Sequence, residues 1–207
     1  MSEQPESDKI KYLALGDSYT IGESVEEHER WPNLLARMLE EELDGTIEVT
    51  IIAKTGWTTD ELMDAVSAAG LMREYDMVSL LIGVNNQYRG YRKKQYRKEF
   101  DQLLNHAIRL AEGDKNRVFV LSIPDYGVTP FAQNKNPEQI ASEIDQYNNI
   151  AEEICGKYEV IYLDITDMSR KAASDGSLIA NDGLHPSGKM YEMWAKMAFS
   201  SSLSLFK

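Results

Sequence analysis

The chain has 207 residues, with 22 Lys or Arg against 34 Asp or Glu, and a formal net charge of −12. This length is typical of one domain with a sizeable core, so we expect a single domain over residues 1–207, with 1–8 as a disordered tail. The charge argues against nucleic acid and anionic membrane surfaces as partners, because both attract dense Lys and Arg. A neutral or cationic small molecule is the easier partner, and the oligomeric state stays open.

The sequence has no run approaching the roughly 20 apolar residues that span a bilayer. Its first residues, MSEQPESDK, lack the apolar region of an export signal. We expect a soluble protein, either cytoplasmic or exported with its signal already removed. The one cysteine, Cys155, falls on the apolar side of a predicted helix, which favours an inert buried thiol.

Five short apolar runs rich in Val and Ile predict buried strands. In chain order they cover residues 10–15, 47–52, 77–82, 118–123 and 160–163. Between them, apolar residues recur at helical spacings of three and four, and a last helix follows Ser187. This alternation of strand and helix predicts a parallel sheet with helices on both faces.

Local signals mark the starts of several helices. Thr58 with Glu61 has the spacing of a capping box, in which each side chain bonds the other residue's backbone N–H. Pro32 and Pro137 suit the first turn of a helix, where a backbone N–H has no partner.

Polar residues and glycines follow the predicted strands, where each strand ends. Ser18 follows the first, Gly56 the second, Asn85 the third and Asp125 the fourth, and His185 comes after the fifth. In open parallel sheets the working groups collect at the carboxyl ends of the strands. We therefore expect these residues to meet at one edge of the sheet.

Two of these segments supply a serine, a histidine and an aspartate. A serine hydroxyl needs a base to take its proton, and that base needs a third group to fix its tautomer. Asp182, three residues before His185, is close enough to bond the imidazole nitrogen remote from the serine. Taken alone, Asp-Ser after a strand is more often a turn or a helix cap, and a histidine before a proline can simply end a loop.

Four short blocks, in order, resemble those of the GDSL-type esterases and lipases, the SGNH hydrolases. The blocks are Gly16-Asp17-Ser18, Gly56, Gly83-Val84-Asn85 and Asp182-x-x-His185. The resemblance covers almost the whole chain. It implies a three-layer α/β/α sandwich, flavodoxin-like, with a five-stranded parallel sheet in the order 2-1-3-4-5.

The resemblance also implies the roles of the residues. Ser18 is the expected nucleophile, His185 the general base and then acid, and Asp182 the group that orients the imidazole. The expected oxyanion hole consists of the backbone N–H groups of Ser18 and Gly56 and the side-chain amide of Asn85. One position departs from the family pattern Gly-x-Asn-Asp, because Asn86 stands in place of the last aspartate. From the sequence alone, Asn86→Asp is expected to be nearly neutral or to change only the stability of the loop.

Aromatic residues accompany these segments and suggest an acyl or alcohol pocket, although each could equally cap the core. The expected substrate-binding residues are Tyr19, Trp57, Tyr88, Tyr126 and Phe131. Segment 124–136 is long for a connection, and the sequence does not distinguish a rim of the pocket from a lid over it. The sequence shows no metal-ligand spacing and no phosphate-binding glycine loop, so we expect no cofactor and no metal.

The favoured function is a serine esterase that forms an acyl-enzyme with short or medium acyl esters or acetyl esters, including acetylated sugars. A thioesterase or a lysophospholipase could use the same site. An alternative of another class is a flavodoxin-like binding domain without catalysis, which the complete set of Ser, Asn, Asp and His argues against.

Overall fold

The computed structural model describes residues 9–72 and 74–206, and its centre is a parallel five-stranded sheet. The strands are β1 (Ile10–Gly16), β2 (Ile47–Ala53), β3 (Met77–Leu81), β4 (Val118–Leu121) and β5 (Ile161–Leu163). They lie in the order β2-β1-β3-β4-β5, which confirms the predicted order. The expectation for residues 1–8 lies outside the described residues.

Helices connect the strands and form the outer layers. They are α1 (Ser18–Ile21), α2 (Trp31–Leu43), α3 (Thr59–Ala68), α4 (Val84–Tyr88), α5 (Lys93–Leu110), α6 (Pro137–Tyr158), α7 (Thr166–Arg170) and α8 (Gly188–Ser202). Short 3₁₀ helices lie at Glu27–Glu29, Lys115–Arg117, Tyr126–Val128 (η3), Pro130–Ala132 (η4), Lys171–Ala173, Gly176–Leu178 and Leu203–Phe206.

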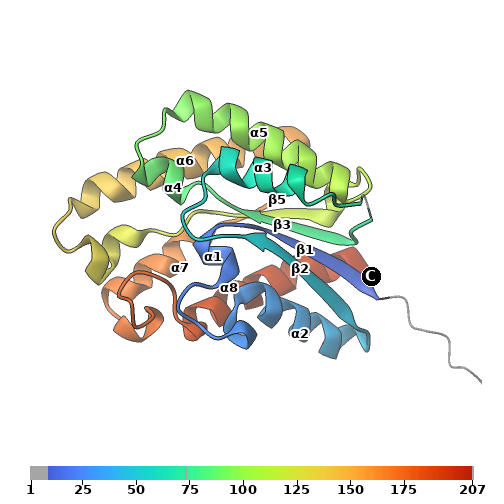
Figure 1. Ribbon diagram of the computed structural model, residues 1–207. Helices are drawn as coiled ribbons and strands as arrows, with labels where there is room; N and C mark the ends of the chain where they lie inside the picture. The colour runs from blue at the N-terminus through green and yellow to red at the C-terminus, as the bar shows by residue number, and fades with distance from the viewer. Residues whose placement is uncertain (1–8, 73, 207) are drawn as a thin grey trace, which may run out of the picture.

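Three layers result from this arrangement. Helices α3, α5 and α6 cover one face of the sheet, and α2 and α8 cover the other (Figure 1). Every residue of β3 and β4 is buried, as the unalternated apolar runs predict for strands covered on both faces. The chain therefore has the α/β/α fold expected from its sequence.

Several helices begin where the local signals predict. Thr58 and Glu61 form the capping box at the start of α3, and Pro32 and Pro137 lie in the first turns of α2 and α6. The hydroxyl of Ser187 accepts from the N–H of Met190 and so caps α8. These caps satisfy backbone groups that a helix end leaves without partners.

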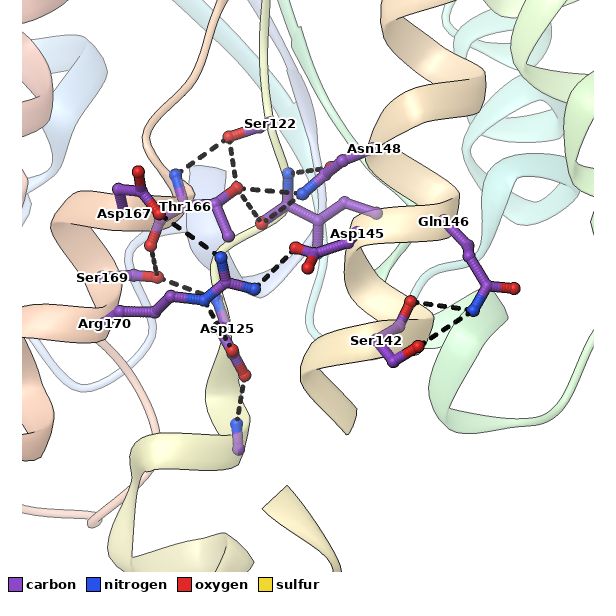
Figure 2. Close-up of polar contacts among 12 residues, drawn as sticks. Ser122, Asp125, Ser142, Asp145, Gln146, Asn148, Thr166, Asp167, Ser169 and Arg170 are labelled. Atoms are coloured by element: carbon purple, nitrogen blue, oxygen red, sulfur yellow. Dashed lines mark hydrogen bonds and ion pairs between the residues drawn. The ribbon is translucent and has the colours of Figure 1, made fainter. Parts of the chain in front are cut away.

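Strand β4 ends two residues earlier than predicted. The backbone of Ile123 bonds the side chain of Asn148 instead of a neighbouring strand: its N–H donates to Oδ1 at 2.7 Å and its carbonyl accepts from Nδ2 at 3.0 Å. Thr166 joins the same network, which Figure 2 shows. Asn148 lies on a helix far along the chain, so no pattern within residues 118–123 reveals this exchange.

Strands β1, β2 and β3 end at the same level of the sheet. In the parallel register Gly16 lies opposite Ala53 on one side and Leu81 on the other. A Cβ at position 16 would come within 2.6 Å of the Leu81 carbonyl oxygen and 2.2 Å of the Thr20 hydroxyl, so only glycine fits. The residues that follow β1, β2 and β3 therefore leave the sheet side by side.

Asp17 turns the chain from β1 into α1 and is fully buried. Its Oδ1 accepts from the N–H of Tyr19 at 3.0 Å, and its Oδ2 has no hydrogen-bond partner among the described residues. Burial raises the pKa of this carboxyl from 3.8 to about 7, against the lowering effect of the backbone hydrogen bonds. The fold therefore favours a neutral carboxyl beside the expected nucleophile.

We expect Asp17→Asn to remove part of the pH dependence of stability. The unfolded carboxyl ionises near 3.8 and the folded one near 7, so wild-type stability falls as pH rises between these values and stays reduced above them. Each pKa unit corresponds to about 1.4 kcal/mol, which gives roughly 4 kcal/mol as an upper limit. When thermal unfolding is measured from pH 4 to 8, the midpoint of the variant should rise relative to that of wild type up to about pH 7.

The matched control is Asp64→Asn, which removes the same charge from an exposed position on α3. A pH-dependent gain of the same size in both variants would mean that general charge repulsion, not the burial of Asp17, is responsible.

Candidate active site

The turn at Asp182–His185 places a carboxylate against an imidazole. Asp182 Oδ2 lies 2.5 Å from His185 Nδ1, and Asp182 Oδ1 accepts from the N–H groups of Leu184 and His185 at 2.9 and 3.0 Å. Because an ionised carboxylate only accepts, Nδ1 carries the ring proton and Nε2 is left as the proton acceptor. His185 is buried, with 7% of its surface exposed.

This turn is braced on both sides. The N–H of Ala180 donates to the His185 carbonyl at 2.8 Å, and Ile179 forms an isolated antiparallel bridge with Pro186. The ring of Tyr19 packs edge-on against the imidazole, with centroids 5.8 Å apart. The histidine is therefore held by backbone bonds and by a buried aromatic ring.

Ser24 is a further support for Asp182 that the sequence did not indicate. Its hydroxyl donates to Asp182 Oδ2 at 2.7 Å, and its φ of 67° lies in the left-handed region that residues with a Cβ rarely adopt. Partial burial raises the pKa of Asp182, but hydrogen bonds from His185, Leu184 and Ser24 outweigh it and hold that pKa well below its usual range. The carboxylate thus stays ionised beside the imidazole.

Ser18 is the first residue of α1, and only Asp17 separates it from the end of β1. It is 5% exposed and lines the same cavity as His185. Among the described residues, no hydrogen bond joins the Ser18 hydroxyl to His185. The structure therefore brings the two side chains to one cavity, with the aspartate–histidine contact already formed.

Gly56 lies in the turn after β2 and Asn85 lies in α4, and hydrogen bonds join these two segments. Gly56 has a φ of 89°, a conformation that glycine adopts without strain. Asn85 Nδ2 donates to the Trp57 carbonyl at 3.0 Å, and Arg89 Nη2 donates to the Gly56 carbonyl at 2.6 Å. Arg89 is a second supporting residue that sequence reasoning missed.

Asn86, the departure from the family pattern, faces away from the cavity. It is fully buried and bonds Thr59, at the start of α3, through both atoms of its amide. The two asparagines are therefore distinct in the structure: Asn85 lines the cavity and Asn86 fixes α4 to α3.

The cavity has a volume of about 130 Å³. The residues that line it are Ser18, Tyr19, Thr55, Gly56, Val84, Asn85, Tyr88, Tyr126, Phe131, Leu184 and His185. Trp57, expected at the substrate, is not among them and contributes its carbonyl to Asn85 instead. Tyr88 and Phe131 form an open aromatic rim, with 50% and 43% of their surfaces exposed.

The wall that carries Tyr126 is anchored at its base by an arginine. Arg170 pairs with Asp125 through Nε at 3.0 Å, with Asp145 through Nη2 at 2.6 Å and with Asp167 through Nη1 at 3.3 Å. Ser169 Oγ accepts from the N–H of Asp125 at 2.8 Å. Figure 2 shows the guanidinium between the three carboxylates.

Segment 124–136 is built from the consecutive 3₁₀ helices η3 and η4. Asp125 caps the first of them by accepting from Gly127 N–H. The N–H of Phe131 donates to the Gly183 carbonyl at 2.9 Å, so the segment is bonded to the turn that holds His185. Tyr126 and Phe131 of this segment line the cavity, so these contacts join that part of its wall to the turn that holds His185.

Metal-binding clusters and membrane-spanning helices are both absent from residues 9–72 and 74–206. No cluster of three or more His, Cys, Asp or Glu side chains there has the arrangement of a metal site. No helix in those ranges is both long and apolar enough to cross a membrane.

Solved structures share the fold across nearly the whole chain. The acetylxylan esterase Axe2 from Geobacillus stearothermophilus has a TM-score of 0.72 at 17% identity, covering 96% of each chain. The lipase/acylhydrolase from Enterococcus faecalis has a TM-score of 0.69 at 18% identity, covering 92% of this chain and 94% of that one. TesA has a TM-score of 0.70 at 18% identity, covering 94% and 99%.

The search of curated proteins finds no match. The model of the GDSL-like lipase/acylhydrolase family matches residues 14–193, from β1 into α8. That match includes each of the four sequence blocks and all the residues that line the cavity. The chain therefore belongs to the GDSL-like lipase/acylhydrolase family and is a serine hydrolase of carboxylic esters.

Proposed function

We propose that this protein hydrolyses short-chain carboxylic esters through a Ser18–His185–Asp182 triad. The observation that carries the proposal is the 2.5 Å contact between Asp182 Oδ2 and His185 Nδ1, on the wall of a cavity that Ser18 shares. This contact fixes the tautomer with Nε2 free to accept a proton.

In the proposed reaction, Ser18 Oγ attacks the ester carbonyl carbon while its proton passes to His185 Nε2. The carbonyl π pair moves to oxygen and forms a tetrahedral oxyanion. When this intermediate collapses, the C–O bond to the alcohol breaks and His185 returns the proton to the leaving oxygen. A water molecule then repeats the sequence on the acyl-enzyme, so the acid is released and Ser18 regains its proton.

Three donors are proposed for the oxyanion: the N–H groups of Ser18 and Gly56 and the amide of Asn85. Asn85 is suited to this role because one Nδ2 hydrogen is already directed to the Trp57 carbonyl, which fixes the amide and leaves the second hydrogen for a ligand in the cavity. Fixed donors of this kind act without reorganising during the reaction.

The size and lining of the cavity support a short acyl group. At about 130 Å³ it is well below the roughly 300–1,000 Å³ of pockets that bury drug-sized ligands. Its walls are mainly apolar or aromatic, and Tyr88 and Phe131 offer open ring faces for the alcohol part of the ester. The acetyl specificity in the name of Axe2, which shares the fold, agrees with a small acyl site.

Ser18→Ala should abolish hydrolysis while the protein remains folded. Loss of a triad member typically costs several orders of magnitude, so less than about 1% of wild-type turnover of p-nitrophenyl acetate should remain. A fluorophosphonate probe should label wild type at Ser18, as peptide mapping would show, and should not label the variant. Ser200→Ala, on the exposed side of α8, is the matched control and should behave as wild type. Label on another serine would remove Ser18 from the mechanism.

Asn85→Ala should lower kcat by about 100-fold or more with little change in KM, because the contact to the oxyanion matures in the transition state. Steady-state kinetics on the same acetyl ester measure this. The control is Asn105→Ala on α5, which removes an amide bonded to Asp101 and Tyr158. Equal losses in both variants, or a loss confined to KM, would count against an oxyanion role.

A series of p-nitrophenyl esters from acetyl to dodecanoyl tests the size argument. We expect kcat/KM to be highest for acetyl to butyryl and to fall by about 10-fold or more at octanoyl, because the longer chain cannot be buried in the cavity and loses its hydrophobic contribution. An acetyl thioester measured alongside separates esterase from thioesterase action. A maximum at octanoyl or beyond would contradict the proposed substrate class.

A further inference from the structure

A buried hydroxyl connects three elements behind the proposed oxyanion hole. The N–H of Thr59, the first residue of α3, donates to Asn86 Oδ1 at 3.1 Å. Asn86 Nδ2 lies 2.7 Å from Thr59 Oγ1, and Thr59 Oγ1 lies 2.5 Å from Glu99 Oε2 on α5. Thr59 and Asn86 are both fully buried, so the two bonds between them are shielded from water, whereas Glu99 is partly exposed at the surface end of the network.

Glu99, at the end of this chain of hydrogen bonds, fixes which group donates and which accepts at each step. An ionised Glu99 carboxylate can only accept, so Thr59 must donate its single hydroxyl proton to it. The Thr59 oxygen is then left to accept from position 86. That position must also accept from Thr59 N–H. Only a side chain with both an acceptor and a donor, such as an amide, satisfies both demands.

The same residues set the geometry of the proposed oxyanion hole. Asn86 is adjacent to Asn85 on α4, and Thr59 follows the turn that carries Gly56. A shift between α4 and the start of α3 would therefore move the Asn85 amide away from the Gly56 N–H. Arg89 bonds the Gly56 carbonyl and pairs with Glu61 on α3, and the Asn85 amide bonds the Trp57 carbonyl. The Thr59 network adds a link from α4 and α3 to α5.

We infer that Glu99 is a positioning residue of the active site, which acts through Thr59 by requiring an amide at position 86. Glu99 and Asn86 are thus an interdependent pair. The kinetic part of this inference rests on the proposed function, and the stability part does not. The sequence led us to expect that Asn86→Asp would be nearly neutral or would change only loop stability, whereas this inference also predicts a loss of activity.

The test is a double-mutant cycle of Asn86→Asp and Glu99→Gln. The single change Asn86→Asp sets two carboxylates on one hydroxyl, which has one proton to give. It should lower the thermal midpoint by several degrees and kcat on an acetyl ester by about 10-fold or more, with KM nearly unchanged. Glu99→Gln alone should cost less than about 3-fold, because the amide of glutamine still accepts from Thr59.

The combined variant should recover most of the loss in both measurements. An aspartate at 86 would accept the Thr59 proton, and a glutamine at 99 would donate to the Thr59 oxygen, so the polarity runs the other way. Asn86→Asp with Glu153→Gln is the control. Glu153, on α6, pairs with Arg97 on α5 but lies outside the network. This control should show no recovery.

The outcomes separate the two proposals. Additive effects in the cycle, or equal recovery with Glu153→Gln, would overturn the pairing of Asn86 with Glu99. If Asn86→Asp does not fold, a folded combined variant supports the pairing and an unfolded one overturns it. Wild-type protein without esterase activity would refute the proposed function, and the thermal cycle would still decide the pairing.

Discussion

The candidate site depends on the Asp182 carboxylate, which accepts hydrogen bonds from four donors. Two are the backbone N–H groups of its own turn, one is the imidazole of His185, and one is the hydroxyl of Ser24. The backbone bonds shape the turn, and that shape sets the imidazole at bonding distance from the second oxygen. A carboxylate with all of its bonds made by fixed partners is a preorganised support for a charged imidazolium. The rest of the site is arranged around that turn.

Sequence predicted the scaffold well because its signals are local. Unalternated apolar runs mark strands covered on both faces, and Thr58, Glu61 and Ser187 mark helix starts within a few residues. The strand order came with the family resemblance, which the four blocks carry. In parallel sheets the working groups collect at the carboxyl ends of the strands, which is why the sequence led us to expect Ser18, His185 and Asn85 together. All three line one cavity.

The supporting residues were not predictable in the same way. Ser24 bonds a residue 158 positions away, Arg89 one 33 positions away and Glu99 one 40 positions away. A serine in an acidic loop and charged residues on helix surfaces have no local pattern that distinguishes them from solvated neighbours. Trp57 illustrates the opposite case, because an aromatic residue beside Gly56 turns its backbone rather than its ring to the site.

The anchoring of Asp125 by Ser169 and Arg170 has a consequence for how the site assembles. The rim follows β4, but the groups that hold it come from the segment after β5, and the Gly183 carbonyl that bonds Phe131 comes later still. These contacts exist only once residues 165–185 have docked on the sheet. Those residues include the histidine and aspartate of the proposed triad. A growing chain that stops before this segment would therefore lack both the catalytic base and the bonds that hold the wall of the cavity in place.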